Sequence, residues 1–131
     1  MPEISILLVE DETITLEYLY STLTIKYSGM TIHRAYDGEE GLELFEAHSP
    51  QIVITDLNMP GMDGKQMASR IRSIKPDSKF IALTGFMDET ASAESAENSF
   101  QFDYYIVKPI MLQELFFAVE QCVNDIEHHD T

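Results

Sequence analysis

The chain has 131 residues, enough for one domain of ordinary size, and its 44% hydrophobic and 24% charged content is typical of a globular protein. Against 8 basic residues stand 23 acidic ones, and the net charge of −15 argues against a surface that binds nucleic acid or an anionic membrane. A single cysteine, the absence of an apolar run of ~20 residues and the lack of a signal-peptide pattern at the start favour a cytoplasmic protein.

Short apolar runs alternate with longer amphipathic segments along the first part of the chain. A strand is predicted over 4–9, and leucines over 16–23 then recur at helical spacing. A second, weaker strand is predicted over 31–35. It leads into a helix for which Asp37 is the expected N-cap and Glu40 occupies the capping-box position.

The same alternation continues through the rest of the chain. The strand over 51–56 is followed by a Pro/Gly-rich loop and a helix, and a fourth strand is predicted over 79–84. The stretch 88–98 contains alanines and glutamates but few large apolar residues, so we expect a poorly anchored helix there. A fifth strand is predicted over 104–107. The last helix has the clearest apolar rhythm, formed by Leu112, Leu115, Phe116, Val119, Cys122, Val123 and Ile126.

Five strand–helix units with continuously apolar strands predict an α/β fold, in which a five-stranded parallel sheet is covered by helices on both faces. No internal linker, repeat or low-complexity segment interrupts this pattern. In such sheets, ligands bind outside the carboxyl ends of the strands. The residues that follow the strands are therefore the candidates for a functional site.

Polar side chains stand where four of the five strands end. Glu10 and Asp11 follow the first strand, Asp56 ends the third, Thr84 ends the fourth and Lys108 follows the fifth. Taken singly, each has an ordinary explanation as a loop residue, a helix cap or a solvated side chain. Because parallel strands end at one edge of the sheet, we expect all five side chains to converge there.

Three carboxylates held close together repel one another unless a cation lies among them. Oxygen ligands with room for water suit Mg²⁺, which prefers one or two carboxylates together with a phosphate. Lys108 adds a charge that can pair with Asp56 or with a phosphoryl oxygen, and Thr84 adds a hydroxyl donor. Asp56 could then attack phosphorus as a carboxylate nucleophile and form an aspartyl phosphate.

Four motifs carry a resemblance to a known family. They are Leu8-Val9-Glu10-Asp11, the run from Thr55 to Gly64, Leu83-Thr84-Gly85 and the run from Tyr105 to Pro109. In this order and spacing they resemble the receiver domain of bacterial two-component response regulators, of the chemotaxis-regulator type. The resemblance implies a flavodoxin-like, doubly wound (βα)5 fold with strand order 2-1-3-4-5. It places the receiver domain at 1–126 and leaves 127–131 as a short tail or the start of a linker.

For the metal, the resemblance implies a site built from the acidic residues. Glu10 and Asp11 correspond to the family's acidic pair, with Asp11 as the direct ligand, although the pair is Glu-Asp here rather than the commoner double Asp. Asp56 and the backbone carbonyl of Asn58 complete the implied ligand set. The implied cofactor is Mg²⁺, for which Mn²⁺ would be a substitute.

For the phosphoryl group, the resemblance implies that Asp56 is the phosphoacceptor. Thr84 would donate a hydrogen bond to the phosphoryl group and Lys108 would pair with it. Tyr105 matches the family's aromatic switch residue, which turns inward when Thr84 is drawn to the phosphate. The Lys108–Pro109 bond corresponds to the family's cis peptide, which would aim Lys108 into the site.

The implied function is phosphorelay signal transduction, with a sensor histidine kinase or a phosphotransfer protein as the phosphodonor. The domain would catalyse only its own phosphorylation and dephosphorylation, so it is expected to be a switch rather than a turnover enzyme. The face built by the fourth helix, fifth strand and fifth helix is the family's usual surface for a homodimer or partner. We expect no direct contact with nucleic acid or membrane, and an output that lies outside these residues.

Four aromatic residues near that face can be interpreted in two ways. Phe86, Phe100, Phe102 and Tyr104 could gather on the partner surface, or they could be core residues beneath a thinly packed helix. Phe86 is bulky for a position beside the phosphorylation site. Our hypothesis is that it shields the site from the attacking water and prolongs the phosphorylated state.

Two other functions are compatible with parts of this pattern. A Mg²⁺-dependent phosphohydrolase would also use a nucleophilic aspartate, but such enzymes typically place a second acid two residues later, where this chain has Asn58. A binding module could keep the fold without ever accepting phosphate. The complete set of acidic residues, Thr84 and Lys108 argues against that alternative.

Overall fold

Residues 4–85 and 100–129 are described in the computed structural model of the protein. The helix expected over 88–98 and the hypothesis on Phe86 fall outside the described residues. Among the described helices, none is both long and apolar enough to cross a membrane.

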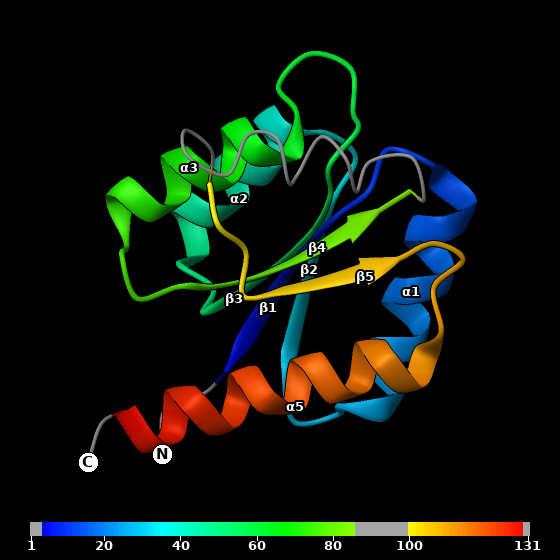
Figure 1. The fold of residues 1–131 in the computed structure, drawn as a ribbon, viewed down its shortest axis with the longest axis vertical. Helices are drawn as coiled ribbons and strands as arrows, with labels where there is room; N and C mark the ends of the chain where they lie inside the picture. The colour runs from blue at the N-terminus through cyan, green and yellow to red at the C-terminus, as the bar shows by residue number, and fades with distance from the viewer. Residues whose placement is uncertain (1–3, 86–99, 130–131) are drawn as a thin grey trace.

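The centre of the molecule is a five-stranded parallel sheet in the order β2-β1-β3-β4-β5 (Figure 1). This confirms the predicted α/β class and the doubly wound, flavodoxin-like topology. Each strand lies within a residue or so of its predicted range, because buried parallel strands are marked in the sequence by continuous apolar runs. The strands are β1 (Ser5–Val9), β2 (Thr31–Ala35), β3 (Ile52–Asp56), β4 (Lys79–Thr84) and β5 (Tyr104–Val107).

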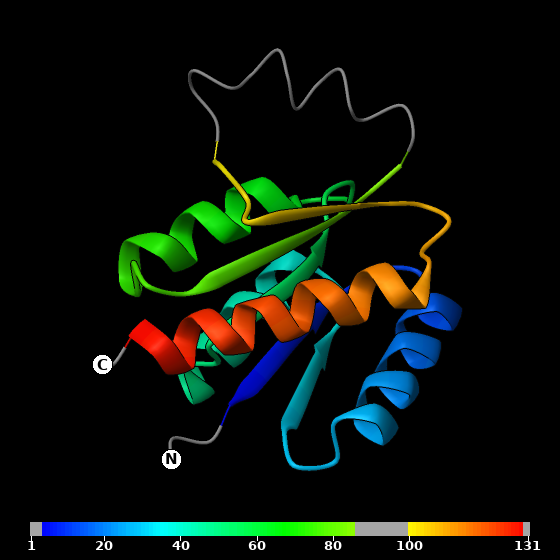
Figure 2. The same ribbon diagram turned by 60° about the horizontal axis from the view of Figure 1, so that its bottom comes forward.

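The described helices cover both faces of the sheet. Figures 1 and 2 show α1 and α5 on one face and α2 and α3 on the other. Since side chains alternate along a strand, β1 to β4 each contribute to both cores: in β1, Ile6 and Leu8 pack toward α1 and α5, whereas Leu7 and Val9 pack toward α2 and α3. The helices are α1 (Thr13–Lys26), α2 (Gly38–His48), α3 (Gly64–Ile74) and α5 (Leu112–His129).

The start of α2 differs from the prediction in one contact. The Asp37 carboxylate accepts a hydrogen bond from the N–H of Glu40, at 2.8 Å, as an N-cap should. The Glu40 carboxylate does not return to the N–H of Asp37, as a capping box requires, but accepts from the N–H of Tyr36, at 2.8 Å. Glu40 therefore ties the residue that follows β2 to the first turn of α2.

The last helix is longer than its apolar rhythm, since α5 continues to His129 and includes three residues beyond Ile126. Cys122 is fully buried on its inner face, as predicted.

The expected gathering of aromatics is only partly realised. Phe100 and Phe102 belong to the core beneath α2 and α3, whereas Tyr104 packs with the core on the side of α1 and α5. Phe100 and Phe102 precede β5, in a segment that is not a strand, so the regular alternation of strand side chains does not place them on the face of Tyr104. For Phe102, which is 7% exposed, the structure supports the core interpretation.

Candidate functional site

The five polar residues predicted to converge do lie together at the carboxyl ends of the strands. Glu10 and Asp11 follow β1, and Asp56 is the last residue of β3. Each of these three carboxylates offers an oxygen within 4.8 Å of the others. Thr84 ends β4, and Lys108, the residue after β5, brings its Nζ to 3.2 Å from Oδ2 of Asp56. The parallel topology is what brings these distant parts of the sequence to one edge.

The three carboxylates differ in exposure and in hydrogen bonding. Glu10 is fully buried, Asp56 is 4% exposed and Asp11 is exposed, so the cluster opens to solvent on the side of Asp11. The Oε2 atom of Glu10 accepts a hydrogen bond from the N–H of Glu12, at 3.0 Å. The Oδ1 atom of Asp56 accepts one from the N–H of Asn58, at 3.3 Å.

The pKa of Glu10 is raised by its surroundings in this cluster. Burial raises the pKa of its carboxyl to about 7, although the hydrogen bond from Glu12 lowers it, and the nearby charge of Asp56 raises it further. Its Oε1 atom is buried and has no hydrogen-bond partner among the described residues. A buried, unsatisfied carboxylate oxygen beside two further carboxylates is suited to a hard divalent cation, and oxygen ligands are those that Mg²⁺ prefers.

Lys108 neutralises part of the acidic charge. Its Nζ lies 3.2 Å from Asp56 and 3.5 Å from Oε1 of Glu10. Burial by itself lowers the pKa of Lys108, but the negative charges of Asp56 and Glu10 outweigh it and raise the pKa, so the ammonium stays charged. The N–H of Lys108 donates to the carbonyl of Thr84, at 2.7 Å, and the Lys108–Pro109 peptide is cis, as the resemblance implied.

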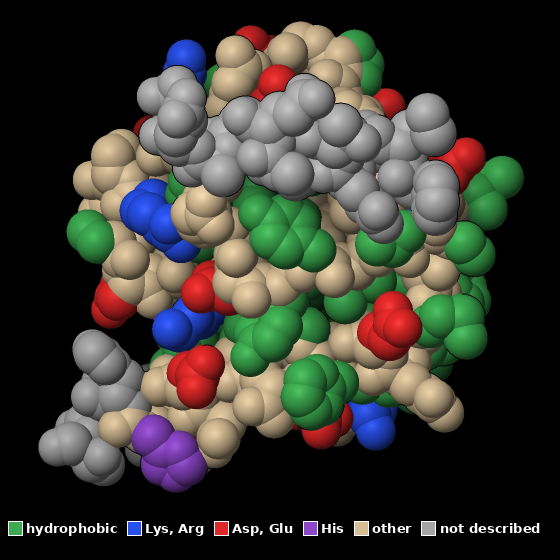
Figure 3. All heavy atoms as spheres, viewed as in Figure 1, with side chains coloured by type: hydrophobic (Ala, Val, Ile, Leu, Met, Phe, Trp, Pro, Cys, Tyr) green, Lys and Arg blue, Asp and Glu red, His purple; other side chains and the backbone are tan. Residues whose placement is uncertain are grey.

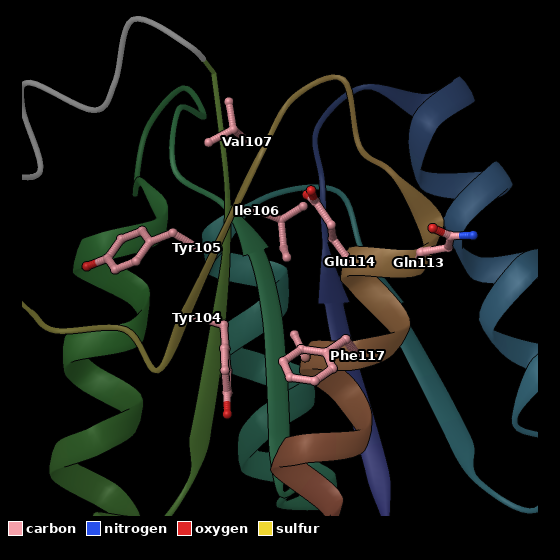
Figure 4. A pocket seen from close by; sticks show the side chains of 8 residues that line it. Tyr104, Tyr105, Ile106, Val107, Gln113, Glu114 and Phe117 are labelled. Carbon is pink, nitrogen blue, oxygen red and sulfur yellow. The ribbon is translucent and has the colours of Figure 1, made fainter.

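Thr84 and Tyr105 are placed on the same side of the sheet. Thr84 is 2% exposed, and its hydroxyl donates to the carbonyl of Gly85, at 3.3 Å. In the parallel register Tyr105 pairs with Ala82, and Thr84 lies two residues further along β4, so all three side chains leave the same face. The Tyr105 ring is 42% exposed and points outward, away from α5 (Figure 4).

The backbone of Asp56 is closely approached by a glycine, Gly64, which ends the Pro/Gly-rich loop. Gly64 is the first residue of α3, and a Cβ there would lie 2.2 Å from the carbonyl oxygen of Asp56 and 3.0 Å from Cα of Leu57. The helix start is fixed by a capping box between Asp63 and Gln66. A glycine at the first position of a predicted helix was the available signal for this close approach.

Two hollows lie near the site on the surface. One, of about 320 Å³, runs between α1 and the segment that follows Lys108, where Ile14 and Tyr18 expose 83% and 56% of their surface. The other, of about 540 Å³, lies between β5 and α5. Figure 4 shows Ile106, Glu114 and Phe117 around this second groove, and Figure 3 shows hydrophobic side chains gathered on the same face.

This geometry places a carboxylate cluster that could hold a metal ion beside a buried aspartate and a lysine ammonium. The Asp56 carboxylate is buried at the floor of the cluster, and Lys108 stands beside it where negative charge on a transferring group would develop. Thr84 offers a hydroxyl at the adjacent strand end. These are the parts that phosphoryl transfer to a carboxylate requires.

Comparison with known proteins points the same way. The sequence profile described as "Response regulator receiver domain" matches residues 6–120. The chain is 30% identical over 126 residues to "Uncharacterized transcriptional regulatory protein YesN" of Bacillus subtilis (strain 168), which covers 95% of this chain and 34% of that protein. It is 31% identical over 112 residues to "Response regulator MprA" of Mycobacterium ulcerans (strain Agy99), which covers 86% of this chain and 47% of that protein.

Among solved structures, the chain is similar to the REC domain of AraT, a response regulator from Geobacillus stearothermophilus. The TM-score is 0.86 and the identity 28%, and the match covers 99% of this chain and 100% of that one. The chain spans a third to a half of the length of the two curated relatives named above.

Receiver domains are signalling switches of two-component phosphorelays. They bind Mg²⁺ at an acidic pocket and interact with histidine kinases or phosphotransfer proteins. The profile match over nearly the whole chain, the 2-1-3-4-5 sheet and the acidic cluster at its carboxyl edge agree with one another. The chain therefore belongs to the response regulator receiver domain family.

Proposed function

We propose that this domain accepts a phosphoryl group on Asp56 from the phosphohistidine of a sensor histidine kinase or a phosphotransfer protein, in a Mg²⁺-dependent reaction. The observation that carries the proposal is the environment of Asp56, a buried carboxylate that lies 3.2 Å from Lys108 and within 4.8 Å of two further carboxylates. The domain acts in the cytoplasm, where its one buried cysteine forms no disulfide.

In this proposal Glu10, Asp11, Asp56 and the backbone carbonyl of Asn58 hold the metal. Bound there, Mg²⁺ or its substitute Mn²⁺ supplies positive charge that offsets repulsion between the acidic cluster and the phosphoryl oxygens. Glu10 is the fully buried member of the cluster, and the exposed Asp11 leaves the cluster open to solvent on one side. The Oε1 atom of Glu10, which is buried and accepts no hydrogen bond from the described residues, supports the fit of a cation to this donor set.

The transfer itself is a substitution at phosphorus. An oxygen of the Asp56 carboxylate forms the new bond to phosphorus as the bond to the imidazole nitrogen of the donor breaks, and the imidazole leaves with the electron pair. Lys108 stabilises the charge on the phosphoryl oxygens from one side, and the Thr84 hydroxyl donates a hydrogen bond to the product. Hydrolysis of the aspartyl phosphate returns the domain to its first state, so it is a switch rather than a turnover enzyme.

The phosphodonor has to bring its imidazole to the open side of the site. The hollow between α1 and the segment after Lys108 adjoins that side, and its exposed apolar residues Ile14 and Tyr18 give side chains of the donor a place to pack. The net charge of −15 is compatible with a histidine kinase or a phosphotransfer protein as the donor, because the proposed contact at Ile14 and Tyr18 is apolar.

Phosphorylation adds negative charge and acceptor oxygens, draws the Thr84 hydroxyl toward the phosphate and lets Tyr105 turn inward. The surface that changes is the one that contains β5 and α5, where a homodimer or an output partner would bind. The groove between β5 and α5 supports this choice, since Tyr105 belongs to its lining. The receiver domain occupies 1–126, and 127–131 form a short tail or the start of a linker.

Intact-mass measurement after incubation with acetyl phosphate and Mg²⁺ tests the proposal. We expect one phosphoryl group on the wild-type chain, and none after Mg²⁺ is chelated or in Asp56→Ala. Undiminished labelling of Asp56→Ala would defeat the assignment of the acceptor. Many turnovers of a phosphate ester would favour the phosphohydrolase, and the absence of any added phosphoryl group on wild type would favour a binding module.

A further inference from the structure

In its outward orientation, Tyr105 contacts Phe102 through both its ring and its hydroxyl. The Tyr105 ring packs edge-to-face on Phe102, with ring centroids 5.7 Å apart and planes at 63°. The hydroxyl of Tyr105 also accepts a hydrogen bond from the backbone N–H of Phe102, at 3.4 Å. Figure 4 shows the ring directed to the side of β5 opposite α5. Phe102 thus contacts both the ring and the hydroxyl of Tyr105.

Phe102 is itself firmly placed. It is 7% exposed and packs edge-to-face on Phe100, with centroids 4.8 Å apart, and on Phe80, at 6.3 Å. Phe80 lies in β4 and is fully buried, and its ring meets that of Phe100 at 4.7 Å. Edge-to-face pairs at these distances are attractive beyond the burial of their surface, so the group resists displacement of any one ring.

Arg72 closes this group on the side of α3. Its guanidinium carbon lies 4.0 Å from the ring centroid of Phe100 and 4.9 Å from that of Phe80. Its Nε is buried and has no hydrogen-bond partner among the residues that the structure describes. A partly buried guanidinium over aromatic faces is held by cation–π attraction. A continuous row of contacts therefore runs from Arg72 through Phe100 and Phe102 to Tyr105.

We propose that Phe102 is a positioning residue that holds Tyr105 outward in the unphosphorylated domain, and that Arg72 supports it through Phe100. The inference rests on the proposed function, in which Tyr105 turns inward toward Thr84 after phosphorylation. Thr84 and Tyr105 leave the same face of the sheet, so the turn carries the ring away from the segment that precedes β5. The ring contact and the hydrogen bond to Phe102 are then both lost.

The contact with Phe102 stabilises only the outward orientation, so it sets the fraction of molecules in which Tyr105 is inward before any phosphate is bound. An interaction present in one of two states shifts their ratio by its full free energy. Weakening the contact should raise the inward-to-outward ratio about two- to tenfold, which is the range expected for loss of one aromatic pair. The phosphoacceptor residues themselves are untouched.

Fluorine NMR of the full chain labelled with 3-fluorotyrosine measures this ratio directly. The Tyr105 signal is assigned from its disappearance in Tyr105→Phe, and its inward position from wild type treated with acetyl phosphate and Mg²⁺. Without a phosphodonor, the signal in Phe102→Leu is expected to move toward the inward position. Phe116→Leu is the matched control, because Phe116 also makes an edge-to-face contact, with Tyr27 at 6.0 Å, away from Tyr105.

Arg72→Met removes the charge but keeps an apolar stem, and a smaller shift in the same direction is expected. This variant carries the test if Phe102→Leu fails to fold. Signals in Phe102→Leu and Arg72→Met that coincide with those of wild type and Phe116→Leu would overturn the inference and leave the proposed function intact. A wild-type Tyr105 signal that does not respond to acetyl phosphate and Mg²⁺, although Asp56 becomes phosphorylated, would overturn the proposed switch and this inference with it.

Discussion

Glu10 illustrates how a site of this kind is prepared for a cation. Its side chain is fully buried, Oε2 accepts a hydrogen bond from one backbone N–H, and Oε1 lies 3.5 Å from the ammonium of Lys108. Burial is the main reason that the pKa of the carboxyl rises to about 7. In the absence of metal, the folded protein therefore bears a free-energy cost for ionising Glu10 that the unfolded chain does not bear.

The first prediction concerns this cost. In metal-free buffer, the stability of wild type relative to Glu10→Gln should fall as the pH rises from about 4.5 to about 7. The folded-state pKa of about 7 lies above the ordinary value of 4.5, so in this window the folded carboxyl keeps a proton that the unfolded one has released. Each pKa unit corresponds to about 1.4 kcal/mol, and we expect a total of about 1–3 kcal/mol.

Urea unfolding of both proteins at a series of pH values measures the difference. The glutamine variant has no proton to release at this position, so it serves as the matched control for every other titrating group. A difference between the two free energies of unfolding that stays constant from pH 4.5 to 7 would show that burial does not raise the pKa of Glu10.

At this scale, the sequence predicted which residues meet but not how each is held. Asp56, Thr84 and Lys108 could be named because each ends a buried strand, and strand ends in a parallel sheet share an edge. The complete burial of Glu10 could not be predicted, since it depends on how its carboxyl fits beneath Lys108. The contact of Arg72 with Phe80 and Phe100 could not be predicted either, because other elements bring these aromatic rings to it.

Helix α3 positions Asp56 through contacts with its backbone. Its first residue, Gly64, lies directly against the backbone of Asp56 and Leu57, and the N–H of Gly64 donates to the carbonyl of Leu57, at 3.2 Å. The N–H of Leu57 in turn donates to Leu83 in β4, at 3.2 Å. The end of β3 is thus fixed between α3 and β4.

The second prediction follows from the closeness of that contact. Gly64→Ala would place a Cβ 2.2 Å from the carbonyl oxygen of Asp56, and a backbone atom cannot yield as a flexible side chain can. We expect a loss of about 1–3 kcal/mol in the free energy of unfolding, as for other overpacked positions, and slower labelling by acetyl phosphate.

The control for this substitution is Gly29→Ala. A Cβ at Gly29 meets nothing within 4 Å, so its effect on stability should stay within about 0.5 kcal/mol. Urea unfolding of the two alanine variants beside wild type makes the comparison. Equal stability of Gly64→Ala and Gly29→Ala would mean that α3 can move away from β3 at little cost.

Among elements, the buried strands were predictable and the short connecting contacts were not. The ranges of β2, β4 and β5 agree with the predicted ones, and in β4 five of the six residues are buried, which leaves a continuous apolar run in the sequence. The hydrogen bond from the N–H of Tyr36 to the Glu40 carboxylate could not be predicted. The sequence has the spacing of a capping box whether Glu40 accepts from Asp37 or from Tyr36. The contact of Phe102 with Tyr105 likewise depends on the path of the chain into β5.

On the scale of the whole molecule, the charge of −15 is spread over the surface, while a small part of it is concentrated in one cluster. A metal ion bound by the folded cluster, and not by the unfolded chain, has to stabilise the fold. Mg²⁺ also screens the surface charge in general, as any added salt does. The two effects can be separated because the site has one carboxylate that is exposed, Asp11.

The third prediction is that Mg²⁺ raises the free energy of unfolding through the site. At a free concentration of about 100 times the dissociation constant, the gain should be about 2.7 kcal/mol for wild type at constant ionic strength. Asp11→Asn should lose most of this gain, because it removes a metal ligand without disturbing the buried part of the cluster. Thermal unfolding with and without Mg²⁺ measures both. An equal gain in wild type and Asp11→Asn would mean that the ion acts by general screening.

The α/β class could be predicted at this scale because alternating strands and helices imply a parallel sheet covered on both faces, whereas the strand order 2-1-3-4-5 was implied by the resemblance to receiver domains. The division of the aromatics between the two cores could not be predicted, because Phe100 and Phe102 precede β5 and their orientation depends on the path of the chain into that strand. Phe100 and Phe102 joined the core beneath α3, and Tyr104 joined the one beneath α5. The row of contacts from Arg72 through Phe100 and Phe102 to Tyr105 forms because both phenylalanines pack on the side of α3.

The identity of the residue that carries the phosphoryl group is the central claim, and chemical trapping tests it most directly. Sodium borohydride reduces an aspartyl phosphate to homoserine, which remains in place during proteolysis and peptide mass spectrometry. After treatment with acetyl phosphate and Mg²⁺, we predict homoserine at position 56 of wild type and none when Mg²⁺ is chelated. Homoserine at any other aspartate, or none at position 56 in a chain that has gained a phosphoryl group, would contradict the account.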